Sequence, residues 1–416
     1  METLTNVLRL RAKGFNRPRG DTKGSIMTTQ LPTNGMNEIT WGRSGPVVTS
    51  ARPFRPDKCS VLFFSRGRGH GHAIPDMAIA DELHTLDSAI DIRFVSYGTG
   101  ATTLLENHRQ VIDLQMHDTN LMWSTVVRAG RVIAKMKPDI VVSHEEFAAL
   151  PVAKIFNIPT VFITEWFTYA ATASMQALLY ADDILFAEQK GLFEEPHYLK
   201  DRIHYVGSVL RRFSWTKSDR HRARHELGLP LDGTVILVAP GGWATEEREP
   251  FAEMILSAFE AIAADRKLLI WLAGNDYEAL LKRCSGRTNV MLKAYDWQID
   301  RLMVASDLAI TKANRITVKE LAALGIPSIS ISHGGNPIDD LIIGQISNNT
   351  SLTVRELDRD LLARQIMKSL RRAMNIGMHS PSVDSNSSGA HLAAKTLASI
   401  IQKIGKEKKF SDSCSG

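Results

Sequence analysis

From Ser60 onward, short apolar runs alternate with amphipathic helical segments, and this alternation constrains the fold more than any other feature of the sequence. Such a pattern is typical of a parallel β-sheet covered by helices. In the first half of the chain a helix is predicted at 75–86, where Pro75 suits a first helical turn. The strands predicted in this half are 60–64, 91–96, 140–143, 160–164, 184–187 and 204–206.

The pattern breaks at residues 207–219 and then restarts, which predicts a second α/β domain. Its predicted strands are 234–239, 267–273, 290–293, 308–311 and 327–332, and its predicted helices are 220–226, 249–264, 299–304, 317–324 and 361–372. The boundaries that follow are a disordered basic extension over 1–58, an N-terminal domain over 59–207, a linker over 208–219, a C-terminal domain over 220–390, and a closing helix and tail over 391–416.

Ligands bind at the carboxyl ends of the strands in sheets of this kind, so the predicted site is a cleft between two Rossmann-like domains. The 416 residues are enough for two such domains with cores of their own. The net charge of +5 arises in the extension, since residues 1–58 carry 10 Lys/Arg and 4 Asp/Glu, which leaves 40 basic and 41 acidic residues over 59–416. This balance favours no nucleic-acid partner.

Cysteine usage and hydropathy limit the class of protein further. Cys59, Cys284 and Cys414 are far apart and lack metal-ligand spacing, which favours neither a disulfide framework nor a zinc site. No run of apolar residues is long enough for a membrane-spanning helix. We therefore expect a protein of the reducing cytoplasm.

A glycine-rich turn follows the first predicted strand and contains Gly69, His70, Gly71 and His72. Backbone N–H groups of such a turn can approach an anionic or polar ligand. The dinucleotide-binding fingerprint is not met, because His72 stands where the third glycine is needed and the strand 91–96 is followed by Tyr97 rather than an acidic residue. No NAD is predicted.

The two histidines of this turn are candidates for acid–base chemistry. Histidine titrates near neutral pH and can accept a proton from a hydroxyl group, provided that a carboxylate orients it. The alternative is that a histidine only caps or packs the turn, which we favour for His70 but not for His72. Three acidic residues are candidates for the orienting carboxylate: Asp118, Glu145 and Glu165.

In the C-terminal half, Thr317 begins a predicted helix whose free N–H groups can hold phosphate. Glu320 can accept hydrogen bonds from both hydroxyls of a ribose. The alternative for Thr317 and Glu320 is a capping box, a common device at helix starts. The acidic pair at 358–360 lies at a predicted helix start, and we interpret it as a cap rather than a metal site.

Several segments resemble the two-domain UDP-glycosyltransferases of the GT-B fold. The similarity is closest to the branch that contains the peptidoglycan N-acetylglucosaminyltransferase and the plastid monogalactosyldiacylglycerol synthase. It covers about residues 59–372, and the donor-binding signature is the strongest part of it. The segments that carry the resemblance are 71–75 with 78–83, 137–142, 159–165, 206–207, 311–312 and 316–327.

The resemblance implies transfer of a sugar from a UDP-sugar to a hydroxyl acceptor, including a lipid-linked or hydrophobic one, with inversion and with neither a bound metal nor a cofactor. It implies peripheral contact with the cytoplasmic face of a membrane. His72 and Glu165 take the catalytic positions, and Gly69, His70, Gly71 and Glu145 lie on the acceptor side. The implied donor-binding residues are Gly241, Gly242, Tyr295, Asp296, Lys312, Arg315, Thr317, Glu320, Asp339 and Asp340.

The sequence also departs from the family pattern. Residues 313–315 (Ala-Asn-Arg) replace a glycine-containing turn, Asp339 and Asp340 stand where glutamines commonly contact the sugar, and the loop 143–150 replaces a glycine-rich acceptor loop. The apolar segment 166–180 fits either a buried helix or contact with a hydrophobic acceptor or membrane. A nucleotide-sugar hydrolase or epimerase, and a non-catalytic nucleotide-sugar-binding protein, remain alternatives.

Overall fold

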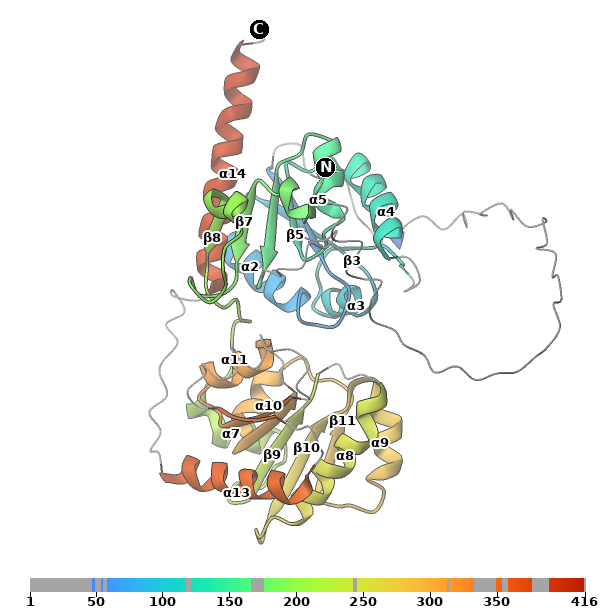
Figure 1. Ribbon diagram of the computed structural model, residues 1–416, viewed down its shortest axis with the longest axis vertical. Coiled ribbons are helices and arrows are strands. Elements are labelled where there is room, and N and C mark those ends of the chain that lie inside the picture. Colours follow the sequence, from blue (N-terminus) through green and yellow to red (C-terminus); the bar gives the residue numbers. More distant parts are fainter. Residues whose placement is uncertain are drawn as a thin grey trace, which may run out of the picture. The chain divides into compact units, whose positions relative to one another are not determined.

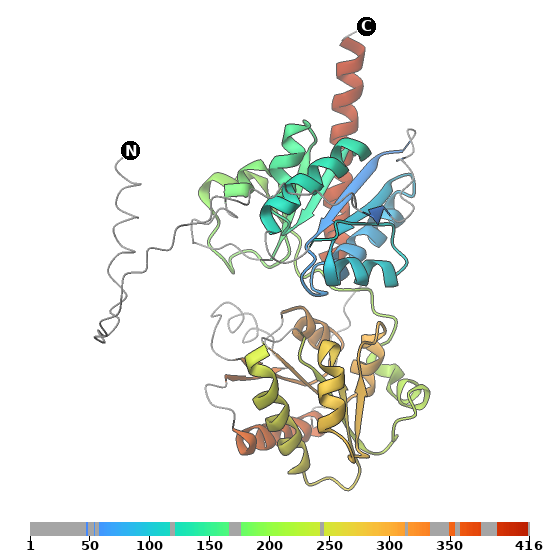
Figure 2. The same ribbon diagram turned by 90° about the vertical axis from the view of Figure 1, so that its right-hand side faces the viewer.

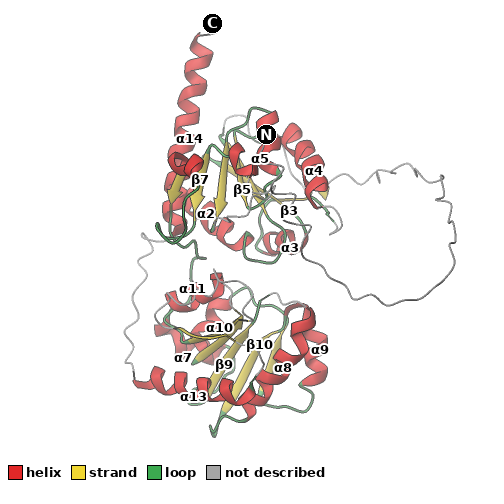
Figure 3. Cartoon of the chain, viewed as in Figure 1, coloured by secondary structure: helices red, strands yellow, loops and turns green. Residues whose placement is uncertain are grey.

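The computed structural model of the chain describes residues 47–48, 54, 58–116, 121–165, 176–241, 245–312, 315–332, 349–353, 358–375 and 389–414. Two sheets form, and each has helices on both of its faces (Figures 1 and 3). All the described strand pairs are parallel except one. The α/β class expected from the sequence is therefore observed in both halves of the chain.

The first sheet has the strand order β1-β4-β3-β2-β5-β6-β7-β8. Its strands are β1 (Val47–Val48), β2 (Ser60–Ser65), β3 (Asp91–Ser96), β4 (Val111–Asp113), β5 (Ile140–His144), β6 (Thr160–Thr164), β7 (Asp183–Phe186) and β8 (Ile203–Tyr205). The helices along this part of the chain are α2 (Ala73–Leu86), α3 (Gly98–Glu106), α4 (Leu121–Met136), α5 (Ala149–Ile155), and the 3₁₀ turns η2 (Leu178–Tyr180) and η3 (His197–Arg202).

The central strand β2 reads as a continuous apolar run because both faces of the sheet are covered. Val61 and Phe63 belong to one core cluster, whereas Leu62 and Phe64 belong to another on the opposite face. All four side chains are at most 1% exposed. The alternation of a strand thus builds two cores from one short segment.

The first sheet begins earlier than the sequence indicates. Val47 and Val48 pair antiparallel with Ile112 and Asp113 of β4, inside the segment predicted to be a disordered extension. Phe54 lies in the same segment, and the Arg93 guanidinium stacks over its ring at 4.3 Å. The predicted boundary at residue 58 therefore lies too far along the chain.

The second sheet has the strand order β11-β10-β9-β12-β13-β14. Its strands are β9 (Thr234–Ala239), β10 (Lys267–Leu272), β11 (Val290–Lys293), β12 (Leu308–Lys312), β13 (Ser328–Ser332) and β14 (Asn349–Thr353). The accompanying helices are η4 (Lys217–Asp219), α7 (Arg220–Glu226), α8 (Thr245–Glu260), η5 (Gly274–Asp276), α9 (Tyr277–Arg283), α10 (Ile299–Ala305), α11 (Arg315–Ala323) and α13 (Arg359–Asn375).

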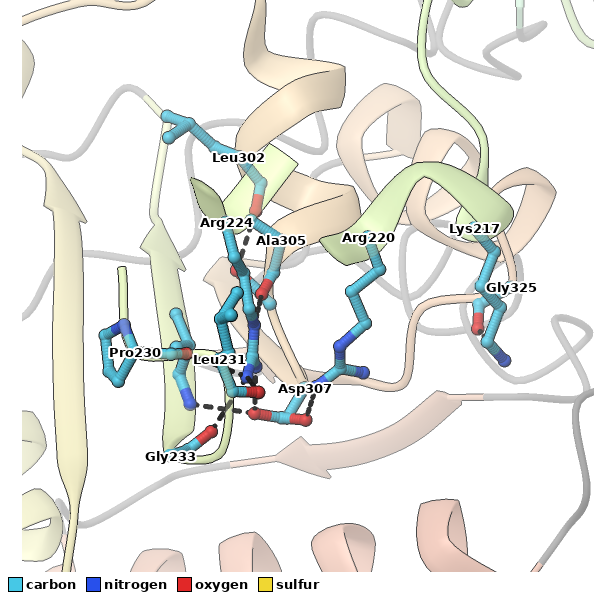
Figure 4. Close-up of polar contacts among 12 residues, drawn as sticks. Lys217, Arg220, Arg224, Pro230, Leu231, Gly233, Leu302, Ala305, Asp307 and Gly325 are labelled. Atoms are coloured by element: carbon cyan, nitrogen blue, oxygen red, sulfur yellow. Dashed lines mark hydrogen bonds and ion pairs between the residues drawn. The ribbon is translucent and has the colours of Figure 1, made fainter. Parts of the chain in front are cut away.

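A buried arginine joins α7 to the start of this second sheet (Figure 4). Arg224 is 2% exposed, and it donates hydrogen bonds to the carbonyl oxygens of Pro230, Leu231, Gly233 and Ala305 at 2.8–3.1 Å. Its guanidinium also binds the Asp307 carboxylate at 2.7 Å. The loop before β9 and the residues before β12 are thereby fixed by one side chain.

The last helix, α14 (Gly389–Cys414), packs against α2 of the first domain (Figures 1 and 2). Ala390, Ala393 and Leu397 are buried in the same core cluster as Ile79 and Leu83. The first turn of α14 lies against the linker, since a Cβ atom at Gly389 would lie 2.3 Å from the Ser208 carbonyl oxygen. Among the residues that the structure describes, no helix is both long enough and apolar enough to cross a bilayer.

Candidate active site

Acidic side chains follow three neighbouring strands of the first sheet at their carboxyl ends. Glu145 comes directly after β5, Glu165 after β6, and Glu188 two residues after β7. Each of these residues is less than 10% exposed. Carboxyl ends of parallel strands share one edge of the sheet, which is where ligands bind in this architecture. The glycine-rich turn after β2 lies at the same edge.

This turn needs glycine because it passes close to β3. A Cβ atom at Gly67 would lie 2.2 Å from the carbonyl oxygen of Tyr97 and 2.4 Å from its ring, so no other residue fits there. Gly69 has φ +71°, in the region that favours glycine. The turn ends at His72, which is the residue immediately before α2.

His72 and Glu145 form a hydrogen-bonded pair. The Nε2 atom of His72 lies 3.2 Å from Oε2 of Glu145, which is also 3.4 Å from Arg66 Nη1. The other oxygen of Glu145 accepts a hydrogen bond of 3.1 Å from the Thr164 hydroxyl. Because a carboxylate only accepts, Nε2 of His72 carries the proton and Nδ1 holds a lone pair when the ring is neutral. Nδ1 is buried and has no hydrogen-bond partner within the described part of the chain.

Of the three carboxylates expected to orient His72, the structure thus selects Glu145. Glu165 instead lies 3.6 Å from the guanidinium of Arg315, and Asp118 is outside the described residues. The catalytic role predicted for Glu165 stays a prediction.

The pKa values of two adjacent glutamates are shifted in opposite directions. Burial alone would raise the pKa of Glu145, but the hydrogen bond and charge of His72, the charge of His144 and the Thr164 hydroxyl together lower it to about 2. Burial raises the pKa of Glu146 to about 6, although the Tyr97 hydroxyl, 3.2 Å away, favours the charged form. Glu145 also has φ +54°, which is uncommon for a residue other than glycine.

His70 is held in the turn by packing and one hydrogen bond, as the alternative interpretation expects. Its Nδ1 lies 2.7 Å from the hydroxyl oxygen of Thr103, and that hydroxyl itself donates to the Thr99 carbonyl. The imidazole therefore donates through Nδ1. Burial, and then the charge of Arg211, lower the pKa of His70. Its ring contacts the rings of Tyr295 and Trp297 edge-on, at 5.3 and 5.7 Å between centroids.

A second histidine pair lies behind the first one. His144, the last residue of β5, places Nδ1 2.7 Å from Oδ1 of Asp76, and the Ser65 hydroxyl donates to the other oxygen of Asp76. His144 and Asp76 are 2% and 0% exposed, and neither was a candidate in the sequence. The sequence did carry a signal for them, because His144 is a polar residue at the end of a strand and Asp76 is an acidic residue in the first turn of a helix.

On the donor side, Glu320 is 1% exposed and accepts a 2.6 Å hydrogen bond from Nε of Arg211. Burial raises its pKa, against the charge of Arg211. The described helix α11 begins at Arg315, so Thr317 is its third residue and the capping-box alternative is wrong. Lys319, next to Glu320, forms a buried ion pair with Glu188. Arg211 and Glu188 were not predicted, because their partners lie more than 100 residues away.

The other predicted donor residues lie on the second sheet. Gly241 lies two residues after β9 and has φ +71°. Next to Lys312, the Thr311 hydroxyl donates a 2.8 Å hydrogen bond to the Ala239 carbonyl oxygen, and this bond joins the ends of β12 and β9. Tyr295 stacks on Trp297 with an interplanar angle of 7°, and Asp296 binds Lys293 at 2.9 Å. Three predicted residues lie outside the described ones: Gly242, Asp339 and Asp340.

Two further expectations concern metals and the apolar segment. Asp358 accepts a 2.9 Å hydrogen bond from the backbone of Leu361, so the interpretation of that acidic pair as a helix cap is confirmed. Across the described ranges, no three His, Cys, Asp or Glu side chains converge on a potential metal position. In the apolar segment 166–180, residues 166–175 lie outside the described residues. At its end, Leu178 is buried, whereas Leu179 and Tyr180 are exposed.

Residues 235–403 match the family model described as the glycosyltransferase family 28 C-terminal domain. This part of the chain is therefore similar to the C-terminal domain of family 28 glycosyltransferases. It is 23% identical over 335 residues to the UDP-N-acetylglucosamine–N-acetylmuramyl-(pentapeptide) pyrophosphoryl-undecaprenol N-acetylglucosamine transferase of Fusobacterium nucleatum, across 77% of this chain and 90% of that protein.

Solved structures share the fold of this chain. The structure of MurG from Acinetobacter baumannii matches with a TM-score of 0.52 and 16% identity, over 83% of this chain and 99% of that one. A putative UDP-N-acetylglucosamine 2-epimerase from Listeria monocytogenes matches with a TM-score of 0.58 and 16% identity, over 84% and 97%. The predicted resemblance to GT-B glycosyltransferases and the predicted enzyme class are confirmed.

Proposed function

We propose that this chain transfers a sugar from a UDP-sugar to a hydroxyl group of an acceptor, with inversion and without a bound metal. The observation that carries the proposal is the His72–Glu145 pair. The Nδ1 atom of His72 is buried and has no hydrogen-bond partner among the described residues. The other ring nitrogen, Nε2, is hydrogen-bonded to the Glu145 carboxylate. A base in this state is ready to accept a proton.

The chemistry follows from that geometry. The acceptor hydroxyl gives its proton to Nδ1 of His72 as its oxygen forms a bond to the anomeric carbon. The bond from that carbon to the UDP oxygen breaks, and UDP leaves with the electron pair. Glu145 remains charged at neutral pH because its pKa is about 2, so it stabilises the imidazolium that forms. General-base assistance of this kind contributes roughly 10² to 10⁴ in rate.

The donor assignment rests on the C-terminal domain. The family match spans β9 to the middle of α14, and Glu320 is the candidate for the ribose hydroxyls. Gly241 and Arg315 are candidates for the diphosphate, with the free N–H groups at the start of α11. Two negative phosphates need such groups in an inverting displacement that uses no metal.

For the acceptor, we propose a lipid-linked or hydrophobic alcohol at the cytoplasmic face of a membrane, which the enzyme contacts peripherally. Support comes from relatives such as that of Fusobacterium nucleatum, whose name gives an undecaprenol-linked acceptor and UDP-N-acetylglucosamine as donor. In this chain the loop after β5 carries Glu145 and Glu146 in place of the family's glycine-rich acceptor loop. The acceptor of this chain is therefore identified by screening lipid alcohols for transfer.

The first experiment is calorimetric titration of the full chain with UDP in buffer containing EDTA, with GDP and NAD as controls. Selective UDP binding is expected. UDP-sugars and lipid alcohols are then screened for transfer, and the anomeric configuration of the product is read from its proton coupling constants. Retained configuration would contradict inversion, and activity lost in EDTA but restored by Mg²⁺ would contradict metal independence.

The second candidate function is a nucleotide-sugar epimerase or hydrolase, favoured by the fold shared with the Listeria monocytogenes structure. The two functions differ in their need for an acceptor. Turnover of UDP-N-acetylglucosamine in the absence of any acceptor, at the rate seen with one, would favour the second candidate. UDP binding without turnover under either condition would favour a non-catalytic binding protein.

A further inference from the structure

A buried trio of polar side chains lies behind the proposed base and takes no part in the reaction described above. Asp76 in the first turn of α2 bridges Ser65, the last residue of β2, and His144, the last residue of β5. All three side chains are at most 2% exposed, so substrate cannot reach them. Burying charged groups is costly unless they are paired and hydrogen-bonded, as Asp76 and His144 are here.

The trio contacts the His72–Glu145 pair in two ways. The ring of His144 lies against the ring of His72 edge-to-face, with 4.8 Å between centroids and an angle of 75° between planes. His144 also precedes Glu145 in the chain, and its charge is one of the causes that lower the pKa of Glu145. The orientation of His144 is in turn fixed, because Asp76 accepts from Nδ1 and Ser65 holds the other oxygen of Asp76.

We propose that Asp76 and His144 are a positioning pair, which holds the His72 ring in the plane that keeps Nε2 on Glu145 and Nδ1 directed at the acceptor hydroxyl. The catalytic part of this statement rests on the proposed function, whereas the effect on the His72 ring does not. Neither residue of the pair touches substrate.

The charges around His144 support the assignment. Burial alone would lower the pKa of His144, but the charge and hydrogen bond of Asp76, together with the charges of Glu145 and Glu165, raise it. These groups face it from α2, from its own strand end and from the end of β6, and His72 faces it from the glycine-rich turn. The Asp76 carboxylate thus favours the charged form of the His144 ring beside His72 and Glu145. Hydrogen-bond partners that orient metal-bound histidines typically contribute 10- to 100-fold in activity, and we expect an effect of the same size for a histidine that acts as a base.

A purely structural role would be to fill the core beneath the turn, and the chain offers a matched control for it. His204 and Asp183 form another His–Asp pair in the same sheet, with 2.7 Å between Nε2 and Oδ1, on β8 and β7. That pair contacts no residue of the proposed site in any described interaction. His204→Gln, like His144→Gln, replaces an imidazole that is paired with an aspartate, but it does so without reaching His72.

The primary test is the tautomer of His72, measured from its side-chain ¹⁵N chemical shifts in the full-length protein and assigned by comparison with His72→Gln. The wild-type ring is expected to be the Nε2-protonated tautomer when neutral. His144→Gln and Asp76→Asn are expected to give a mixture of tautomers, and His204→Gln is expected to leave the wild-type signal. This readout needs no substrate, so it remains valid if the proposed function is wrong.

The second readout is kinetic and applies once a transfer assay is available. His144→Gln and Asp76→Asn are expected to lower kcat roughly 10- to 100-fold with less than about twofold change in the Kd of UDP. Ser65→Ala, a smaller perturbation of the same trio, is expected to act in the same direction if the larger changes prevent folding. An unchanged His72 tautomer in all three variants would overturn the proposal, as would a kcat that falls equally in His204→Gln.

Discussion

At the scale of single residues, Glu145 and Glu146 show how much the surroundings of a side chain decide. They are neighbours in one loop and are both less than 10% exposed, yet one pKa falls to about 2 and the other rises to about 6. Glu145 faces two histidines and a threonine hydroxyl. For Glu146, the Tyr97 hydroxyl and the charges of Arg66 and Arg68 do not offset the effect of burial. These shifts make opposite predictions for stability against pH.

Glu145→Gln tests the lowered pKa. A carboxyl whose pKa is lowered from 4.5 to about 2 by folding stabilises the native state above pH 4.5, and this contribution is lost as the pH falls toward 2. The full contribution is about 3 kcal/mol. The difference in the free energy of unfolding between wild type and Glu145→Gln, from urea titrations, is expected to shrink between pH 6 and pH 3. A difference independent of pH would contradict the shift.

Glu146→Gln is expected to show the reverse dependence. Because folding raises the pKa from 4.5 to about 6, ionisation of this carboxyl costs stability as the pH rises through that window. The cost above pH 6 is about 2 kcal/mol. Relative to wild type, Glu146→Gln should therefore gain stability between pH 4 and pH 7.5 in the same urea titrations. A loss of stability in Glu146→Gln over that pH range would contradict the raised pKa of Glu146.

At the scale of elements, the sequence located most strands to within one residue and missed three. The missed strands are β1, β4 and β14, which have two, three and five residues. β1 and β4 are too short to show a hydrophobic pattern, and the sequence of β14 is polar except for Leu352. Pairing with a neighbour in the sheet is what makes these segments strands. The helix predicted at 249–264 is α8 (Thr245–Glu260), which begins four residues earlier. Pro250 lies inside this helix rather than near its start.

Arg224 makes a prediction for how α7 is attached to the second sheet. Arg224→Met removes the Arg224 hydrogen bonds of four carbonyl oxygens and leaves the Asp307 carboxylate with Arg220 and the Val235 backbone N–H as its partners. The free energy of unfolding is expected to fall by about 3–5 kcal/mol. The control is Arg266→Met, which breaks an ion pair with Asp232 whose side chains are 70% and 73% exposed. That change is expected to cost less than about 1 kcal/mol. Equal losses in urea unfolding would show that the burial of Arg224 has no energetic consequence.

The docking of α14 can be tested with two glycines of that one helix. Gly389→Ala places a methyl group 2.3 Å from the Ser208 carbonyl oxygen, and overpacking of this kind is expected to cost about 1–3 kcal/mol. Gly405→Ala meets no atom within 4 Å, so it is expected to stabilise the helix by about 0.5–1 kcal/mol. Thermal unfolding followed by circular dichroism should give melting temperatures that move in opposite directions. A lower melting temperature for Gly405→Ala would contradict the second expectation.

At the scale of the whole molecule, α11 connects distant parts of the chain. Arg315, Lys319 and Glu320 form ion pairs with Glu165, Glu188 and Arg211, which belong to the first sheet's loops and to the linker. The helix proposed to bind the nucleotide is thus in contact with the part of the chain that carries the proposed base. Binding of UDP at Glu320 has to compete with, or rearrange, the Arg211 contact.

Glu320→Ala is expected to weaken UDP binding by about 1–3 kcal/mol, the range for loss of a charged hydrogen-bond partner. Calorimetry on the full chain measures this change. Glu253→Ala, which removes an exposed carboxylate of α8 that pairs with Arg283, is the control and should bind UDP as the wild type does. Unchanged affinity in Glu320→Ala would mean that Glu320 serves only as the partner of Arg211.

The sequence by itself determined the α/β architecture with its two sheets and the glycine-rich turn that carries His72. These depend on hydrophobic periodicity and on local turn chemistry, both of which act over a few residues. It also supplied the resemblance to GT-B glycosyltransferases. It did not decide which carboxylate orients His72, because Glu145 and Glu165 end neighbouring strands in the same way.

Only the tertiary structure made that choice, by placing Glu145 on His72 and Glu165 beside Arg315. It also revealed the Asp76–His144 pair and the contacts of Arg211 and Lys319, and it showed that α11 begins at Arg315, two residues before the predicted start. Each of these contacts joins residues 68 or more positions apart in the chain. Such pairs depend on strand order and on how the ends of strands meet, and no local pattern in the sequence encodes that proximity.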